Sequence, residues 1–130
     1  MKFKDIYVIV PAFNEQNVIK DIINNLLKNF SNVIVINDGS NDKTLEIIND
    51  LDIKILSHEI NLGVGAAVQT GFDYVSNIPD AKAVITFDAD GQHLVDDAVE
   101  MAKEILICDE GIIFGTRFPK HSKNIPNVKR

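Results

Sequence analysis

The 130-residue sequence has no tryptophan, a single cysteine and no apolar run long enough to cross a membrane. Because Cys108 has no second cysteine to pair with, an internal disulfide is excluded and a reducing compartment fits the chain. A membrane-spanning helix needs about 18 or more apolar residues, and the apolar run near the N-terminus reaches Pro11 and Glu15 too early for a secretory signal. These absences predict a globular, cytoplasmic protein.

Basic residues are scarce in the body of the chain and concentrated at its end. The net charge is −6, and residues 117–130 hold five of the 13 basic residues but none of the 19 acidic ones. An acidic body argues against nucleic-acid binding, which requires a basic face. The basic tail would attract phosphate or the inner face of a membrane, which predicts peripheral membrane contact. A solvated, frayed terminus explains the same residues, so both interpretations stay open.

Two hydrophobic periods alternate along the chain. Short apolar runs typical of strands alternate with segments of helical spacing. The strands are expected at residues 6–10, 32–36, 53–56, 83–87 and 111–115, and the helices at 18–30, 42–51, 65–75 and 95–106. Apolar strands alternating with helices predict an α/β fold with a mostly parallel sheet and helices on both faces. The periodicity stops near residue 118, so we expect one domain over 1–118 and a basic tail over 119–130.

Polar or glycine-rich loops follow every predicted strand. The loops contain "PAFNE", "NDGSND", "HEINLGVGAA", "DADGQH" and "TRF". Ligands bind at the carboxyl edge of parallel sheets, so five such loops predict one site there. Taken alone, "NDGS" has the residues of an ordinary tight turn. Taken alone, "NLGVGAA" is only a weak indication of a helix N-terminus that binds phosphate.

The segment "DADGQH" carries the most specific chemistry. On an extended backbone Asp88, Asp90 and Gln92 would point to one side, because side chains alternate. Three oxygen-bearing side chains at a strand end suit Mg²⁺ or Mn²⁺. His93 adjoins these acids and could support the site, whereas His58 and His121 are interpreted as ordinary loop residues.

In this order and spacing, "VPAFNE", "NDGSNDKT", "NLGVGAAVQTG", "DADGQH" and "GTRF" resemble the family-2 glycosyltransferases of GT-A type fold, over residues 6–118. The resemblance is strongest to the polyprenyl-phosphate (dolichyl-phosphate) mannosyl- and glucosyltransferases. It implies metal-dependent, inverting transfer of a sugar from a UDP or GDP sugar. The implied acceptor is a lipid phosphate or a growing glycan, as in the synthesis of cell-envelope glycans.

The resemblance also implies residue roles, carried over by position. Asp88 and Asp90 match the acids at the ribose and the diphosphate-bound metal, Gln92 matches a further metal ligand, and Arg117 matches a basic residue facing the phosphates. The remaining matches are to residues that contact or shape the nucleotide pocket: Pro11, Ala12, Glu15, Asp38, Gly63 and Gly65. Asp38 matches the acid that hydrogen-bonds the base.

Two alternatives remain beside a glycosyltransferase. Relatives of this kind continue into an acceptor-binding half, which residues 119–130 would begin, so the chain could bind a nucleotide sugar without transferring it. An apolar face left where that half packs would favour homo-oligomers. A sugar-phosphate nucleotidyltransferase is disfavoured, because "VPAFNE" lacks the glycine-rich basic motif expected after its first strand.

Overall fold

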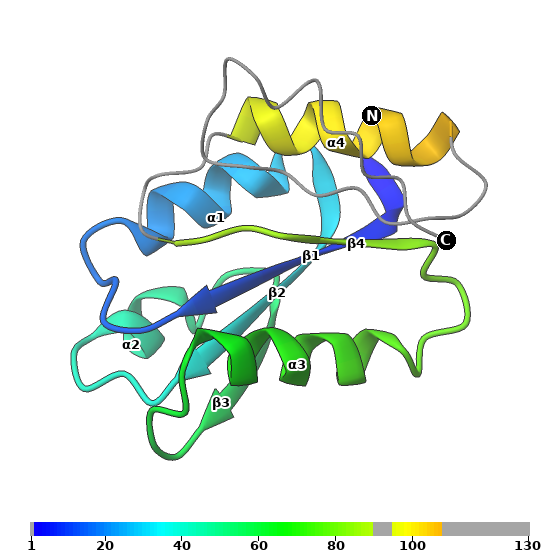
Figure 1. Ribbon diagram of the computed structural model, residues 1–130. Helices are drawn as coiled ribbons and strands as arrows, with labels where there is room; N and C mark the ends of the chain where they lie inside the picture. Colours follow the sequence, from blue (N-terminus) through cyan, green and yellow to red (C-terminus); the bar gives the residue numbers. More distant parts are fainter. Residues whose placement is uncertain (1, 90–94, 108–130) are drawn as a thin grey trace.

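The computed structural model describes residues 2–89 and 95–107, which form a parallel sheet packed between helices (Figure 1). The sheet order is β3-β2-β1-β4, and every neighbouring pair is parallel. Its strands are β1 (Phe3–Ala12), β2 (Phe30–Asp38), β3 (Lys54–His58) and β4 (Ala83–Thr86). Four of the five predicted strands are therefore confirmed, and the fifth, at 111–115, lies outside the described residues.

Helices cover both faces of the sheet, as the alternating pattern predicts (Figure 1). They are α1 (Ile19–Leu27), α2 (Thr44–Ile48), α3 (Val64–Val75) and α4 (Val95–Ile107). Core residues of α1, α2 and α4 pack together on one face, and α3 packs on the other. Within the described ranges no helix is long and apolar enough to cross a membrane.

The central strand β1 is apolar on both sides because both sides are covered. Val8 and Val10 belong to the cluster under α1 and α4, whereas Ile9 belongs to the cluster under α3. A Cβ on Gly71 of α3 would lie 2.7 Å from Cγ2 of Ile9. Glycine costs about 1 kcal/mol of helix propensity relative to alanine, and here it permits the close approach of α3 to the sheet.

The helix predicted over residues 18–30 extends too far at its C-terminal end. It was expected to continue to Phe30, but α1 ends at Leu27 and Phe30 begins β2. The Phe30 ring is buried 5.3 Å from the Phe3 ring, and the Phe3 N–H donates to the carbonyl of Asn29 at 2.8 Å. Phe30 has helical spacing in the sequence, but its pairing with β1 and the burial of its ring place it in a strand instead.

Because the four strands are parallel, their carboxyl ends share one edge of the sheet. The segments 13–18, 39–43, 59–63 and 87–89 follow these ends. The N–H of Phe87 donates to the carbonyl of Ile9 at 2.8 Å and continues the β1–β4 contact beyond Thr86. The fold therefore places three of the five predicted loops, and the described start of the fourth at residues 87–89, at the same edge.

Candidate functional site

A cleft of about 480 Å³ opens at the carboxyl edge of the sheet. This volume lies within the range of roughly 300–1,000 Å³ typical of small-molecule sites. The lining includes six residues proposed from the sequence, contributed by all four strand ends: Pro11, Ala12, Glu15, Asp38, Gly63 and Asp88. A smaller hollow of about 250 Å³, between the end of α3 and the start of β4, contains none of them.

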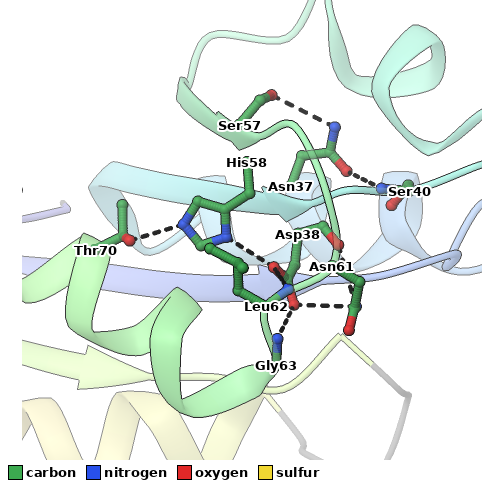
Figure 2. Close-up of polar contacts among 9 residues, drawn as sticks. All are labelled: Asn37, Asp38, Ser40, Ser57, His58, Asn61, Leu62, Gly63 and Thr70. Carbon is green, nitrogen blue, oxygen red and sulfur yellow. Dashed lines mark hydrogen bonds and ion pairs between the residues drawn. The ribbon is translucent and has the colours of Figure 1, made fainter.

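Asp38 ends β2, and its carboxylate takes part in four hydrogen bonds (Figure 2). Its Oδ1 lies 2.7 Å from Nδ1 of His58 and 2.9 Å from the N–H of Leu62. Its Oδ2 accepts from Nδ2 of Asn61 at 3.1 Å and from the N–H of Gly63 at 2.9 Å. The carboxylate therefore joins the end of β2 to the end of β3 and to the loop before α3.

These contacts also set the charge state of Asp38, which is only 3% exposed. Burial raises the pKa of this carboxyl, but the hydrogen bonds from His58, Leu62 and Gly63 outweigh it and hold the pKa below its ordinary value. Asp38 thus places a negative charge at the floor of the cleft.

His58 was interpreted from the sequence as an ordinary loop residue, and that prediction was wrong. It is the last residue of β3, its Nδ1 contacts Asp38, and its Nε2 lies 2.8 Å from Oγ1 of Thr70 in α3. The sequence also offered no reason to choose Asn61, which donates to Asp38, or Thr70, which contacts His58. The available signal was the position of His58 at a strand end, the same place from which the other candidates were chosen.

The two glycines proposed for the pocket have different surroundings. Gly63 precedes α3, has a φ of 102° and lines the cleft, so its backbone requires glycine. Gly65 lies in the first turn of α3, is exposed, and a Cβ there would meet no atom within 4 Å. Gly65 is not among the residues that line the cleft.

Glu15 is positioned by hydrogen bonds between the loops after β1 and β2. Its N–H donates to Oγ1 of Thr44 at 2.9 Å, and Oγ1 of Thr44 donates to Oδ1 of Asp42 at 2.5 Å. Nearby, the N–H of Asn14 donates to Oγ of Ser40, and the N–H of Asn41 donates to Oδ1 of Asn14. The two loops therefore hold each other at the rim of the cleft.

Asp42 is the charged member of this loop contact. It accepts hydrogen bonds from the N–H groups of Gln16 and Thr44 and from the Thr44 hydroxyl. Burial raises the pKa of Asp42, and these hydrogen bonds lower it further than burial raises it. The net result is a carboxyl whose pKa lies below its ordinary value.

The acid-rich segment is described only up to Ala89. Asp88 follows β4 and lines the cleft, while its neighbours Phe87 and Ala89 are buried in the core. Asp90, Gln92, His93 and Arg117 lie outside the described residues, as does the tail 119–130. Among residues 2–89 and 95–107, no group of three or more His, Cys, Asp or Glu side chains could hold a metal ion. The described part of the chain supplies Asp88 as one oxygen donor at the expected strand end.

A parallel α/β domain with a cleft at the carboxyl edge of its strands has the architecture of a nucleotide-binding domain. The chain belongs to glycosyl transferase family 2, whose family model matches residues 7–130. Its structural neighbours are GT-A glycosyltransferases. One is the crystal structure of glucosyl-3-phosphoglycerate synthase from Mycobacterium tuberculosis in complex with Mn²⁺, UDP-glucose and phosphoglyceric acid, at 25% identity and a TM-score of 0.56, over 65% of this chain and 33% of that one.

Two relatives match almost the whole chain. One is the UDP-N-acetylglucosamine–dolichyl-phosphate N-acetylglucosaminyltransferase of Methanococcus voltae, 35% identical over 100% of this chain and 59% of the relative. Another is an uncharacterized protein of Methanocaldococcus jannaschii, 39% identical over 97% of this chain and 53% of the relative. The chain therefore spans little more than half the length of these relatives.

Proposed function

We propose that the chain is the donor-binding half of a metal-dependent, inverting glycosyltransferase. It would take a sugar from a UDP or GDP sugar and pass it to a polyprenyl phosphate or a growing glycan. The observation that carries this proposal is the cleft itself, because six residues from four separate strand ends converge on one cavity of nucleotide size. Pro11, Ala12 and Glu15 would contact the base and ribose, and Gly63 would bring backbone close to the nucleotide.

The relatives support a lipid phosphate as acceptor. The Methanococcus voltae relative is named for transfer to dolichyl phosphate, and so is a dolichyl-phosphate β-glucosyltransferase of Trichomonas vaginalis, 30% identical over 85% of this chain. A phosphate acceptor is already ionised at neutral pH, so it needs no general base to remove a proton, whereas a sugar hydroxyl does. An enzyme with such an acceptor would work at the inner face of a membrane.

The residue types in "DADGQH" would suit a hard divalent cation. Asp88 brings a carboxylate into the cleft, and Asp90 and Gln92 would complete an oxygen-rich set typical of Mg²⁺ or Mn²⁺. When bound, the cation would neutralise charge on the departing nucleotide diphosphate as a Lewis acid. Arg117 would add a second positive charge at the phosphates. The acidic body makes such cations necessary, because it would otherwise repel two phosphates.

Calorimetric titration of UDP and GDP, with and without Mn²⁺, tests the donor site. We expect one nucleotide to bind only with Mn²⁺, and Asp90→Ala to abolish that binding. Asp50→Ala is the matched control, since Asp50 is an exposed acid outside the cleft lining. Binding that depends on neither Mn²⁺ nor Asp90 would contradict the metal site.

Turnover separates an enzyme from a binding module. The protein is incubated with Mn²⁺ and UDP-N-acetylglucosamine, UDP-glucose or GDP-mannose, with dolichyl phosphate as acceptor, and release of free nucleotide is measured. Acceptor-dependent release identifies a transferase. Nucleotide binding without release with any donor would instead identify a nucleotide-sugar-binding module. Formation of a nucleotide sugar from a sugar phosphate and UTP would identify a nucleotidyltransferase.

A further inference from the structure

We propose that His58 is a positioning residue of the nucleotide site, acting through Asp38 on the loop at residues 61–63 beside the cleft. The inference rests on the proposed function, because it assigns a role within the same cleft. His58 itself is not among the residues that line the cleft, whereas Asp38, Asn61 and Gly63 are. Its influence on a bound nucleotide would therefore be indirect.

The histidine joins three elements of the fold (Figure 2). It ends β3, its Nδ1 lies 2.7 Å from Asp38 at the end of β2, and its Nε2 lies 2.8 Å from Thr70 in α3. The side chains of His58 and Asp38 are only 12% and 4% exposed. With a partner on each ring nitrogen, the imidazole has one fixed orientation, and it transmits that orientation to the carboxylate.

The carboxylate of Asp38 has no spare acceptor capacity. A carboxylate offers about four acceptor positions, and His58, Asn61, Leu62 and Gly63 supply four donors. His58 shares Oδ1 with the N–H of Leu62, which turns Oδ2 toward Asn61 and Gly63. Any donor from a nucleotide base would have to displace one of these groups. Asp38 therefore shapes the cleft by holding the loop, and His58 holds Asp38.

Two substitutions separate the two contacts of the ring. The amide nitrogen of asparagine can take the place of Nδ1, so His58→Asn keeps the bond to Asp38 and loses the one to Thr70. The longer glutamine places its amide nearer the position of Nε2, so His58→Gln keeps the contact with Thr70 and loses the one to Asp38. Thr70→Val removes only the partner of Nε2 and supplies a milder perturbation.

The test combines amide hydrogen exchange with nucleotide affinity in the full chain. Exchange is followed at Leu62 and Gly63, whose N–H groups donate to Asp38, and at Val35 in the core of β2. Affinity is measured by calorimetry with UDP and GDP in the presence of Mn²⁺. For His58→Gln we expect about tenfold faster exchange at Leu62 and Gly63 and about tenfold weaker nucleotide binding, the size of one lost charge-assisted hydrogen bond. His58→Asn should remain near wild type in both.

The outcomes are distinct. Unchanged exchange at Leu62 and Gly63 in His58→Gln overturns the inference, as does unchanged nucleotide affinity when those amides do open. A purely structural histidine would accelerate exchange at Val35 as much as at the loop. If His58→Gln fails to fold, Thr70→Val decides the matter, with faster exchange at the loop but not at Val35 as the supporting result. If the wild-type chain binds neither nucleotide, the proposed function fails, and exchange alone decides whether His58 positions the loop.

Discussion

Gly39 lies directly against the backbone of Ile60: a Cβ added to Gly39 would come within 2.4 Å of the carbonyl carbon of Ile60. Gly39 follows β2 and Ile60 follows β3, so this contact brings the second and third loops of the cleft together. Gly39 also has a φ of 70°, a conformation that side chains with a Cβ rarely adopt. Two separate reasons therefore require glycine at position 39: its positive φ, and the lack of space for a Cβ beside Ile60.

Gly39→Ala should be strongly destabilising for this reason. We expect the free energy of unfolding to fall by at least about 2 kcal/mol, from backbone strain together with the displaced loop. Urea denaturation followed by circular dichroism measures this. Gly65→Ala is the matched control, because Gly65 lies in α3 with open space at its Cβ position. It should be neutral or stabilise by up to about 1 kcal/mol. Equal effects of the two substitutions would contradict the contact.

Thr44 should be needed for its hydroxyl rather than its shape. The residue is fully buried, and Oγ1 accepts the N–H of Glu15 while donating to Asp42. Thr44→Val leaves that N–H without its acceptor, so we expect a loss of about 1–3 kcal/mol in unfolding free energy. Thr44→Ser keeps the hydroxyl and should lose only about 1 kcal/mol, the transfer energy of one methyl group. Urea denaturation of the two variants checks the order, and a valine variant as stable as the serine variant would refute it.

Stability should decline in acid because of Asp38 and Asp42. The pKa of each carboxyl is lowered in the folded protein from an ordinary value of 3.8. A lowered pKa stabilises the fold fully above the ordinary value, and this contribution disappears as the pH falls through the lowered pKa. Unfolding free energy from urea titrations between pH 7 and pH 2 should thus fall mainly below about pH 4. Asp38→Asn should be less stable at pH 7 and show a shallower acid decline. A wild-type slope in that variant would contradict the assignment.

Glu15 should contribute to nucleotide affinity if the cleft is the donor site. It lines the cleft, and its backbone is held by Thr44. Glu15→Ala should weaken Mn²⁺-dependent binding of the preferred nucleotide about tenfold, the loss expected for a hydrogen bond to a charged group. Glu46→Ala, at an exposed position of α2, should bind like wild type. Calorimetry measures both, and thermal unfolding confirms that each variant is folded. Equal affinities would remove Glu15 from the donor site.

Much of the architecture follows from local pattern. The apolar runs containing Val8 and Val35 are short, rich in branched residues and bounded by turn residues, so they predict buried strands whatever their neighbours are. Because such strands alternate with amphipathic helices, a parallel sheet covered on both faces is nearly the only packing available. The parallel arrangement in turn places Pro11, Asp38 and Asp88 at one edge.

The pattern fails where contacts between distant segments decide the outcome. Phe30 has helical spacing with α1, yet pairing with Phe3 makes it the start of a strand. Gly65 shares a glycine-rich motif with Gly63, but only Gly63 lies at the cleft, because the helix begins between them.

His58 shows most clearly what only the tertiary structure decides. A lone histidine at the end of a short strand has no informative neighbour in sequence, since Asp38 and Thr70 lie 20 and 12 residues away. The order β3-β2-β1-β4 sets the end of β3 beside the end of β2. Helix α3 begins at the same edge of the sheet and brings Thr70 within hydrogen-bond distance of His58. The sequence by itself therefore determined where these four strands lie, to within about three residues at most ends, and the chemistry of the loops that follow them. The packing of β2, β3 and α3 determined which side chains meet, because hydrogen bonds form between neighbours in space.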